Sequence, residues 1–259
     1  MKTLERLFGT PHPVALVTGS GAPRVGQTVA RTLAARGYRL IVHANTSKAA
    51  AQKVAEEFQR DGHDALALSA NLSEEHEVQK LLEAALSRFQ RVDVLVNTAA
   101  IWERKKLEEV TAEDVRRHFE INTLGTFLCC RSFGLQMVSQ ATGGAIVNLG
   151  DWAVKRPYLD YAAYFPSKGS IPTMTRGFAV ELAARNPHVR VNAVLPGPVM
   201  LPPDLPAEER AAAINGTLVK REGTPQNVAD AVVALVENDF ITGACLPVDG
   251  GRGVFSSPT

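Results

Sequence analysis

Residues 14–26 are VALVTGSGAPRVG, and this stretch decides the fold. Val14–Val17 is a short, fully apolar run of the kind found in strands that are buried on both faces. The turn Thr18–Gly26 leads directly into a helical pattern that reaches Arg36 and ends at Gly37. Glycines let the backbone approach a phosphate, and a helix N-terminus supplies N–H donors and partial positive charge. The stretch therefore predicts a phosphate-binding turn, although an ordinary turn could also need glycine dihedrals.

Strand and helix patterns alternate along the rest of the chain. Further strands are expected at residues 40–42, 65–68, 92–96, 145–149, 189–194 and 244–248, and further helices at 47–60, 73–90, 111–119, 121–140, from about 161, and at 225–238. Such alternation predicts a parallel sheet with right-handed crossovers. The expected fold class is α/β, a Rossmann-type domain of three layers, doubly wound.

Length and composition set limits on the kind of protein. The chain has 259 residues, 45% of them hydrophobic, and a net charge of +1 with acids and bases interspersed, so no nucleic-acid surface is expected. No apolar run approaches the roughly 18 residues of a membrane span, and the start lacks an apolar signal core. Cys129, Cys130 and Cys245 lack metal or redox spacing. A cytoplasmic protein without a metal site or membrane partner is expected.

Residues 1–259 are expected to form a single domain. The segment at about 198–216 lies between two core elements and is rich in proline. We interpret this segment as an insertion that covers a substrate.

The end of the second expected strand indicates which dinucleotide would bind. An acid there would bind a ribose 2′-hydroxyl and repel a 2′-phosphate. This chain has no acid there, but His43, Asn45, Thr46, Ser47 and Lys48 instead. Amide, hydroxyl and basic groups, including a histidine that could be cationic, suit a phosphate. NADP(H) is therefore favoured over NAD(H), while the alternative is that Ser47 caps a helix and Lys48 is only solvated.

Tyr164 and Lys168 share one face of the helix expected from about residue 161, because they are four residues apart. A phenol has a pKa of ~10 and is a poor acid at neutral pH. An adjacent ammonium would favour the ionised phenol and lower this pKa. The pair is a candidate proton donor, and the alternative is an amphipathic helix without chemistry.

Taken together and in order, these motifs resemble the short-chain dehydrogenase/reductase family over about residues 13–251. The motifs that carry the resemblance are Thr18–Gly26, Asn97–Ala100, Asn122, Tyr164 with Lys168, Pro196–Gly197 and Asp249–Gly251. The resemblance implies seven parallel strands in the order 3-2-1-4-5-6-7, an NADP(H)-type cofactor, a small-molecule substrate and a homotetramer.

The resemblance also implies roles for individual residues. Tyr164 would donate a proton, Lys168 would hold the nicotinamide ribose, and Asn122 would anchor a water chain toward Lys168; a helix-interior amide bonded to nearby backbone is the alternative for Asn122. The residues expected at the cofactor are Gly19, Arg24, Val25, Gly26, His43, Asn45, Thr46, Ser47, Asn71, Leu72, Asn97, Ala99, Ala100, Lys168, Pro196, Gly197 and Val199.

Asp151 is the main departure from the family pattern. The family usually has a serine thirteen residues before the tyrosine, where this chain has Asp151. A carboxylate cannot donate a hydrogen bond to a substrate carbonyl unless it is protonated. A ring nitrogen that must gain a proton could use an acid, and burial would raise its pKa. This residue favours C=N over C=O reduction and resembles the pteridine reductase branch, unless Asp151 pairs with Lys155 or Arg156.

Other features fit the same branch. Arg24 replaces a glycine of the phosphate turn, Trp102 stands where an aromatic ring would stack a pterin, and Leu201–Asp204 resembles the branch's substrate loop. Arg24 could simply bind phosphate, and Trp102 could be a packing residue. The expected substrate contacts are Trp102, Asp151, Tyr164, Tyr161 and Leu201.

Four departures limit the resemblance to this branch. The phosphate turn is one residue longer, Asn71 replaces the aspartate that usually meets adenine, and Leu201 replaces a threonine. Pro172 lies inside the catalytic helix and cannot donate to the Lys168 carbonyl, so a kink is expected.

Three hypotheses follow. The main one is an NADPH-dependent reductase that transfers hydride to a pterin-like N-heterocycle. The second is an NADPH-dependent carbonyl or 3-oxoacyl thioester reductase that tolerates Asp151. The third is a non-catalytic dinucleotide-binding regulatory protein, which would have no chemical need for Tyr164, Lys168 and Asn122.

Overall fold

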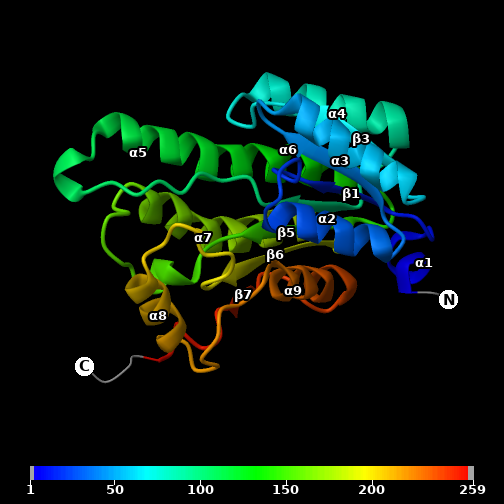
Figure 1. Cartoon of the computed structure of the whole chain (residues 1–259). Helices are drawn as coiled ribbons and strands as arrows, with labels where there is room; N and C mark the ends of the chain where they lie inside the picture. Colours follow the sequence, from blue (N-terminus) through cyan, green and yellow to red (C-terminus); the bar gives the residue numbers. More distant parts are fainter. Residues whose placement is uncertain (1–2, 256–259) are drawn as a thin grey trace.

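The computed structural model describes residues 3–255 and contains one seven-stranded sheet (Figure 1). The strands are β1 (Val14–Val17), β2 (Arg39–Ala44), β3 (Ala65–Ser69), β4 (Val94–Asn97), β5 (Gly144–Leu149), β6 (Val189–Pro196) and β7 (Cys245–Val248). They pair in the order β3-β2-β1-β4-β5-β6-β7, and every pairing is parallel. The predicted fold class and strand order are confirmed.

The sheet is covered by helices on both faces. One apolar core packs the sheet against α1 (Thr3–Phe8), α2 (Val25–Ala35), α3 (Lys48–Arg60) and α9 (Pro225–Glu237). The other core packs it against α4 (Glu75–Phe89), α6 (Gly125–Ser139) and α7 (Tyr164–Ala183). The strands of a sheet covered in this way are apolar on both sides, as in β1, whose four residues are all buried.

Shorter elements lie around the sheet and its covering helices. They are η1 (Leu107–Glu109), α5 (Ala112–His118), the π-helix η2 (Phe119–Leu124), η3 (Trp152–Lys155) and α8 (Ala207–Asn215). The last of these lies in the proline-rich segment at 198–216 and has no buried residue. Figure 1 shows the red segment that ends the described residues close to α8. An exposed helix in this place is compatible with the substrate-covering insertion, which stays a prediction.

Two differences from the expected elements have simple causes. Helix α1 was not expected, because six residues are too few to show a helical period. Helix α7 starts at Tyr164 rather than at about 161, because residues 161–163 form a turn before it. The helix continues through Pro172 to Ala183. The kink at Pro172 stays a prediction.

Within residues 3–255, no helix combines the length and apolar character that a membrane crossing needs. The same residues contain no group of three or more His, Cys, Asp or Glu side chains arranged to hold a metal ion.

Candidate active site

The phosphate turn has the backbone shape that glycine requires. Gly19 has φ of +68°, and a Cβ there would lie 3.0 Å from the Ala99 Cα. A Cβ on Gly26 would lie only 2.3 Å from the Thr98 hydroxyl oxygen, so a side chain would displace the start of α2. Arg24 is the N-cap residue of α2 and its side chain is exposed, with Val25 as the first helical residue. The turn and the helix N-terminus fit a pyrophosphate.

The segment after β2 presents polar and basic side chains to solvent. Asn45, Thr46, Ser47 and Lys48 are all exposed. Ser47 precedes α3, but its side chain makes no capping hydrogen bond. No acidic side chain is present in the segment to repel a 2′-phosphate.

His43 does not belong with these groups, and its expected role as a possible cation at the phosphate is wrong. Its side chain is buried, with Nδ1 accepting from the Gly19 N–H at 3.1 Å and Nε2 lying 3.0 Å from the Ala70 carbonyl. Burial lowers the pKa of the imidazole to about 4. The neutral ring therefore supports the phosphate turn from beneath.

A cavity of about 260 Å³ lies beyond the ends of β2 and β3. Its lining includes Asn45 and Asn71 together with Ser73, Glu74, Glu120, Ile121 and Leu124. The Asn71 side-chain oxygen accepts from the Ser73 N–H, and the neighbouring Leu72 is buried. The adenine contacts predicted for Asn71 and Leu72 stay predictions; Asn71 lines the cavity and Leu72 does not.

The carboxyl ends of β4 and β6 carry the remaining expected cofactor residues. Ala99 and Ala100 after β4, and Pro196, Gly197 and Val199 at and after β6, are all partly exposed. Asn97 is different, because its side-chain amide is buried and donates to the Asn148 oxygen at 2.9 Å. Its side chain is thus used inside the protein, which leaves its backbone for the predicted contact.

Asp151 and Tyr164 form one hydrogen-bonded pair at the start of α7. The Tyr164 hydroxyl donates to the Asp151 Oδ2 at 2.8 Å. The other carboxylate oxygen accepts from the Ala153 N–H at 2.8 Å, which fixes the carboxyl group. The alternative in which Asp151 pairs with Lys155 or Arg156 is not what the structure contains, since Arg156 donates to backbone carbonyls instead.

Burial controls the acidity of this pair. The pKa of Asp151 is raised by desolvation, which outweighs its hydrogen bonds to Ala153 and Tyr164. The pKa of Tyr164 is raised well above its ordinary value by burial and by the adjacent Asp151. The expectation that Lys168 would lower the Tyr164 pKa is therefore wrong for this chain. Asp151 is the stronger acid of the two.

Lys168 lies one turn along α7 and is also buried. Its ammonium group donates to the Leu149 carbonyl at 2.8 Å. Burial lowers the pKa of Lys168 to about 8, and the nearby charge of Asp151 opposes this decrease. Its predicted contact with the nicotinamide ribose stays a prediction.

Asn122 lies in the π-helix η2 and is fully buried. Its amide nitrogen donates to the Ile101 carbonyl at 3.0 Å and to the Ser167 hydroxyl at 3.0 Å, and its oxygen accepts from the Ile101 N–H at 2.9 Å. The side chain therefore ties the loop after β4 to α7. The predicted water chain toward Lys168 stays a prediction.

Aromatic side chains form the wall beside the pair. The rings of Trp102 and Tyr161 are stacked, with centroids 4.8 Å apart and an angle of 10°. The indole N–H of Trp102 donates to the Tyr158 hydroxyl at 3.2 Å. One face of Trp102 is therefore occupied by Tyr161, yet 41% of the residue remains exposed. Leu201, the remaining expected substrate contact, is partly exposed and its N–H donates to Glu222.

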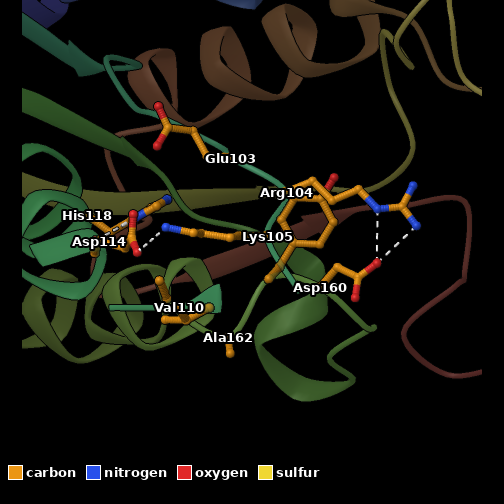
Figure 2. A pocket seen from close by; sticks show the side chains of 10 residues that line it. Glu103, Arg104, Lys105, Val110, Asp114, His118, Asp160 and Ala162 are labelled. Atoms are coloured by element: carbon orange, nitrogen blue, oxygen red, sulfur yellow. Dashed lines mark hydrogen bonds and ion pairs between the residues drawn. The ribbon is translucent and has the colours of Figure 1, made fainter. Parts of the chain in front are cut away.

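A second cavity, of about 290 Å³, lies beside Tyr161 (Figure 2). His118 lines this cavity and was not predicted from the sequence. Its buried ring packs edge to face against Tyr164, with ring centroids 6.2 Å apart. Its Nδ1 lies 2.8 Å from the Asp114 carbonyl, and its Nε2 has no hydrogen-bond partner in the described part of the chain. No sequence pattern indicated this residue, because His118 ends α5 and Asn122 lies in the π-helix that follows, so their spacing does not follow the α-helical period.

The fold and the arrangement of Tyr164, Lys168 and the phosphate turn define a class, the dinucleotide-dependent α/β oxidoreductases. The family described as Enoyl-(Acyl carrier protein) reductase matches residues 22–252. This chain belongs to the short-chain dehydrogenase/reductase family and is an oxidoreductase of the kind that uses nicotinamide dinucleotides.

Relatives span almost the whole chain. Carbonyl reductase family member 4 of Danio rerio is 36% identical, over 92% of this chain and 97% of its own. The 3-oxoacyl-[acyl-carrier-protein] reductase of Synechocystis sp. is 34% identical, over 93% and 97%. The solved structure of acetoin dehydrogenase from Enterobacter cloacae has a TM-score of 0.81 at 30% identity, and the match covers 93% of this chain and 95% of that chain.

Proposed function

We propose that this protein is an NADPH-dependent reductase of a C=N bond in a pterin-like N-heterocycle. The observation that carries the proposal is the hydrogen bond of 2.8 Å between Tyr164 and Asp151. Most of the family has a hydroxyl group at the Asp151 position, and a hydroxyl suits a carbonyl oxygen. A partly buried carboxyl group whose pKa is raised by desolvation suits a nitrogen that must gain a proton.

The residues divide the proton chemistry between them. When it is bound, the reduced dinucleotide supplies a hydride to the carbon of the C=N bond. Asp151 holds the proton that goes to the nitrogen, because it is the stronger acid of the pair, and Tyr164 keeps the carboxyl group in position. After the transfer, the bond is CH–NH and Asp151 regains its proton from solvent. Lys168 is held one helical turn from Tyr164 by its hydrogen bond to the Leu149 carbonyl.

The proposed cofactor is NADP(H), held through residues 18–26 and 45–48. The exposed side chains of Asn45, Thr46, Ser47 and Lys48 support a 2′-phosphate contact, and the free face of Trp102 supports stacking of a flat ring. With His43 excluded, Lys48 and Arg24 are the cations proposed for phosphate.

A second candidate function is reduction of a ketone or a 3-oxoacyl thioester. The names of the relatives favour it, since both a carbonyl reductase and a 3-oxoacyl-[acyl-carrier-protein] reductase are more than 30% identical to this chain. In this case a neutral Asp151 would donate to the carbonyl oxygen in place of serine. The third hypothesis, a non-catalytic dinucleotide-binding regulatory protein, requires that no substrate be turned over.

One substrate panel tests the proposal. NADPH oxidation is followed with a dihydropterin, dihydrofolate, a quinonoid pterin, a 3-oxoacyl thioester and simple ketones. Turnover of one or more N-heterocycles, lost in Tyr164→Phe, supports the proposal. Turnover of ketones or the thioester alone rejects it in favour of the second function. Tight NADPH binding without turnover of any substrate supports the third hypothesis.

Self-association is also proposed, as a homotetramer of single-domain subunits. Phe127 and Leu135 on α6, and Val180 on α7, are large apolar residues that are 41%, 49% and 71% exposed. Helices α6 and α7 are neighbours (Figure 1), so these side chains can contribute to one apolar surface. Light scattering on the purified protein tests the subunit number, and Phe127→Lys is expected to reduce it.

A further inference from the structure

Basic side chains flank the candidate active site in two groups. In the first group, shown in part in Figure 2, every cation has an acidic partner. Arg104 pairs with Asp160 at 3.0 Å, Lys105 with Asp114 at 2.6 Å, and Arg117 with Glu103 at 2.9 Å. The charges of this group are therefore balanced within the protein.

The second group consists of Arg156, Lys220 and Arg252, and we call it the basic cluster. Within residues 3–255 these cations make no ion pair, and their partners are backbone carbonyls. Arg156 donates to the carbonyls of Arg252 and Phe255, Lys220 to that of Asn215, and Arg252 to that of Ala213. Lys220 also lies over the ring of Phe255, at 4.4 Å. The basic cluster thus gathers around residues 252–255, where the nearby Asp249 carboxylate accepts from the Gly251 and Gly253 N–H groups and forms no ion pair with the three cations in the described part of the chain.

Arg252 of the basic cluster lies next to the turn that carries Asp151. The Arg252 guanidinium lies over the Trp152 ring at 4.9 Å, and Trp152 directly follows Asp151 in the chain. Arg252 also bridges to α8 through the Ala213 carbonyl, so it lies between the Asp151 turn and the exposed helix. The pKa of Tyr158 is raised mainly by burial, and the charges of Asp151 and Arg252 change it in opposite directions.

Within residues 3–255 no acidic side chain pairs with these cations, and such an arrangement is unfavourable without an anion. Arg252 is partly buried, and its pKa is lowered by burial and by the like charge of Arg156. Two neighbouring guanidinium groups repel each other and lose part of their hydration. A bound carboxylate or phosphate would offset the repulsion between the guanidinium groups and replace their lost hydration, because guanidinium forms paired hydrogen bonds with such groups.

We propose that the basic cluster binds an oxyanion, a carboxylate or a phosphate, carried by the substrate at a distance from the bond that is reduced. Arg252 is the main contact, because it alone of the three packs on the residue after Asp151. Arg156 and Lys220 add charge at the rim. The proposal deepens the proposed function by giving the substrate an acidic class, and it rests on that function only for the identity of the reduced bond.

Direct binding can be followed without any turnover. The chain has two tryptophans, so Trp102→Phe leaves Trp152, beneath Arg252, as the only fluorescent reporter of its kind. This variant is titrated with benzoate, phenyl phosphate and the uncharged benzamide. A saturable change in Trp152 fluorescence with benzoate or phenyl phosphate, about tenfold tighter than with benzamide, is expected. The two anions separate a carboxylate site from a phosphate site.

Charge variants decide whether the basic cluster is responsible. In the same background, Arg252→Gln is expected to abolish the preference for the anion, and Arg156→Gln to weaken it severalfold. Arg156 is exposed, so its variant remains informative if Arg252→Gln fails to fold. Arg117→Gln is the matched control, because it removes one exposed arginine from the balanced group and should leave the titration unchanged.

A substrate pair completes the test. Whichever substrate the panel identifies is compared as its carboxylate or phosphate form and as its neutral amide or alcohol. The wild type should prefer the charged form by about tenfold in kcat/KM, and Arg252→Gln should lose the preference. Equal binding of benzoate, phenyl phosphate and benzamide by the wild-type cluster would overturn the proposal. Equal losses with charged and neutral substrates in Arg252→Gln would overturn it too, leaving a structural clamp. Failure of the pterin assignment would leave the fluorescence result unchanged.

Discussion

The cofactor side and the catalytic side of the cleft are built in different ways. On the cofactor side, which comprises residues 18–26 and 45–48, the polar side chains after β2 are exposed. On the catalytic side, which comprises Asp151, Tyr164 and Lys168, the functional groups are largely buried and bonded within the protein. The first side can bind any anion of the right shape, while the second is fixed in advance.

The largest effect is expected from Tyr164→Phe. The variant removes the hydroxyl that positions Asp151, so kcat should fall by about 10²-fold, the size expected when a catalytic group is misplaced. NADPH binding should stay unchanged, because the cofactor side is intact. Tyr38→Phe is the matched control, since it removes a buried hydroxyl that has no partner in the described residues. If Tyr164→Phe lost NADPH affinity as well as turnover, the claim that the cofactor side and the catalytic side act independently would be contradicted.

His43 gives the cofactor side a dependence on acid. Its folded pKa of about 4 lies below the ordinary 6.5, so the unfolded chain binds a proton first as pH falls. Stability should therefore be lost between pH 6.5 and about 4, by roughly 3 kcal/mol from this group. The free energy of unfolding, measured with urea at several pH values in this range, should decrease less with falling pH in His43→Gln than in the wild type. The variant of an exposed histidine, His188→Gln, should match the wild type. Equal decreases in all three proteins would contradict a buried neutral His43.

Lys48→Glu tests the choice of dinucleotide. Reversing this exposed charge should raise the KM for NADPH by about tenfold, equivalent to 1.4 kcal/mol, and leave kcat within a factor of two. The KM for NADH should change little, because NADH lacks the 2′-phosphate. Lys53→Glu makes the same charge change farther along α3 and serves as the control. If the wild type prefers NADH, the proposed phosphate contact is wrong.

A smaller effect is expected in the pH profile of the catalytic side. The proton that goes to the substrate is held by Asp151, and desolvation raises the pKa of this carboxyl group. The kcat/KM for reduction should therefore fall as pH rises through the raised pKa of Asp151. In Asp151→Asn this falling limb should be absent, and the residual activity should fall only as Lys168 loses its charge, near its pKa of about 8. An unchanged falling limb in Asp151→Asn would show that the limb does not belong to Asp151.

The sequence predicted the features that depend on a regular period or on chain order. The strand order followed from alternating elements and the family resemblance, and the shared face of Tyr164 and Lys168 followed from their four-residue spacing. Asp151 was recognised because it departs from the pattern of the family, and its distance to Tyr164 came only with the structure.

Features that depend on tertiary burial could not be predicted in this way. A histidine at the end of β2 has the same sequence signal whether it faces solvent or lies beneath the phosphate turn, as His43 does. The stack of Trp102 on Tyr161 joins two irregular segments that share no period. The position of Arg252 over Trp152 brings together residues a hundred positions apart. The increase in the Tyr164 pKa likewise reflects burial, which spacing alone does not reveal.

The most direct test of the central claim is the ratio of kcat/KM for a dihydropterin to that for a ketone, measured in wild type and in Asp151→Ser. A serine restores the hydroxyl that most of the family has at this position and removes the acid. The account predicts a wild-type ratio above one, and a fall of about 10²-fold in the ratio for Asp151→Ser, caused by loss of dihydropterin reduction. A wild type that reduces only ketones, or an Asp151→Ser variant with an unchanged ratio, would contradict the role of Asp151 as the acid for a ring nitrogen.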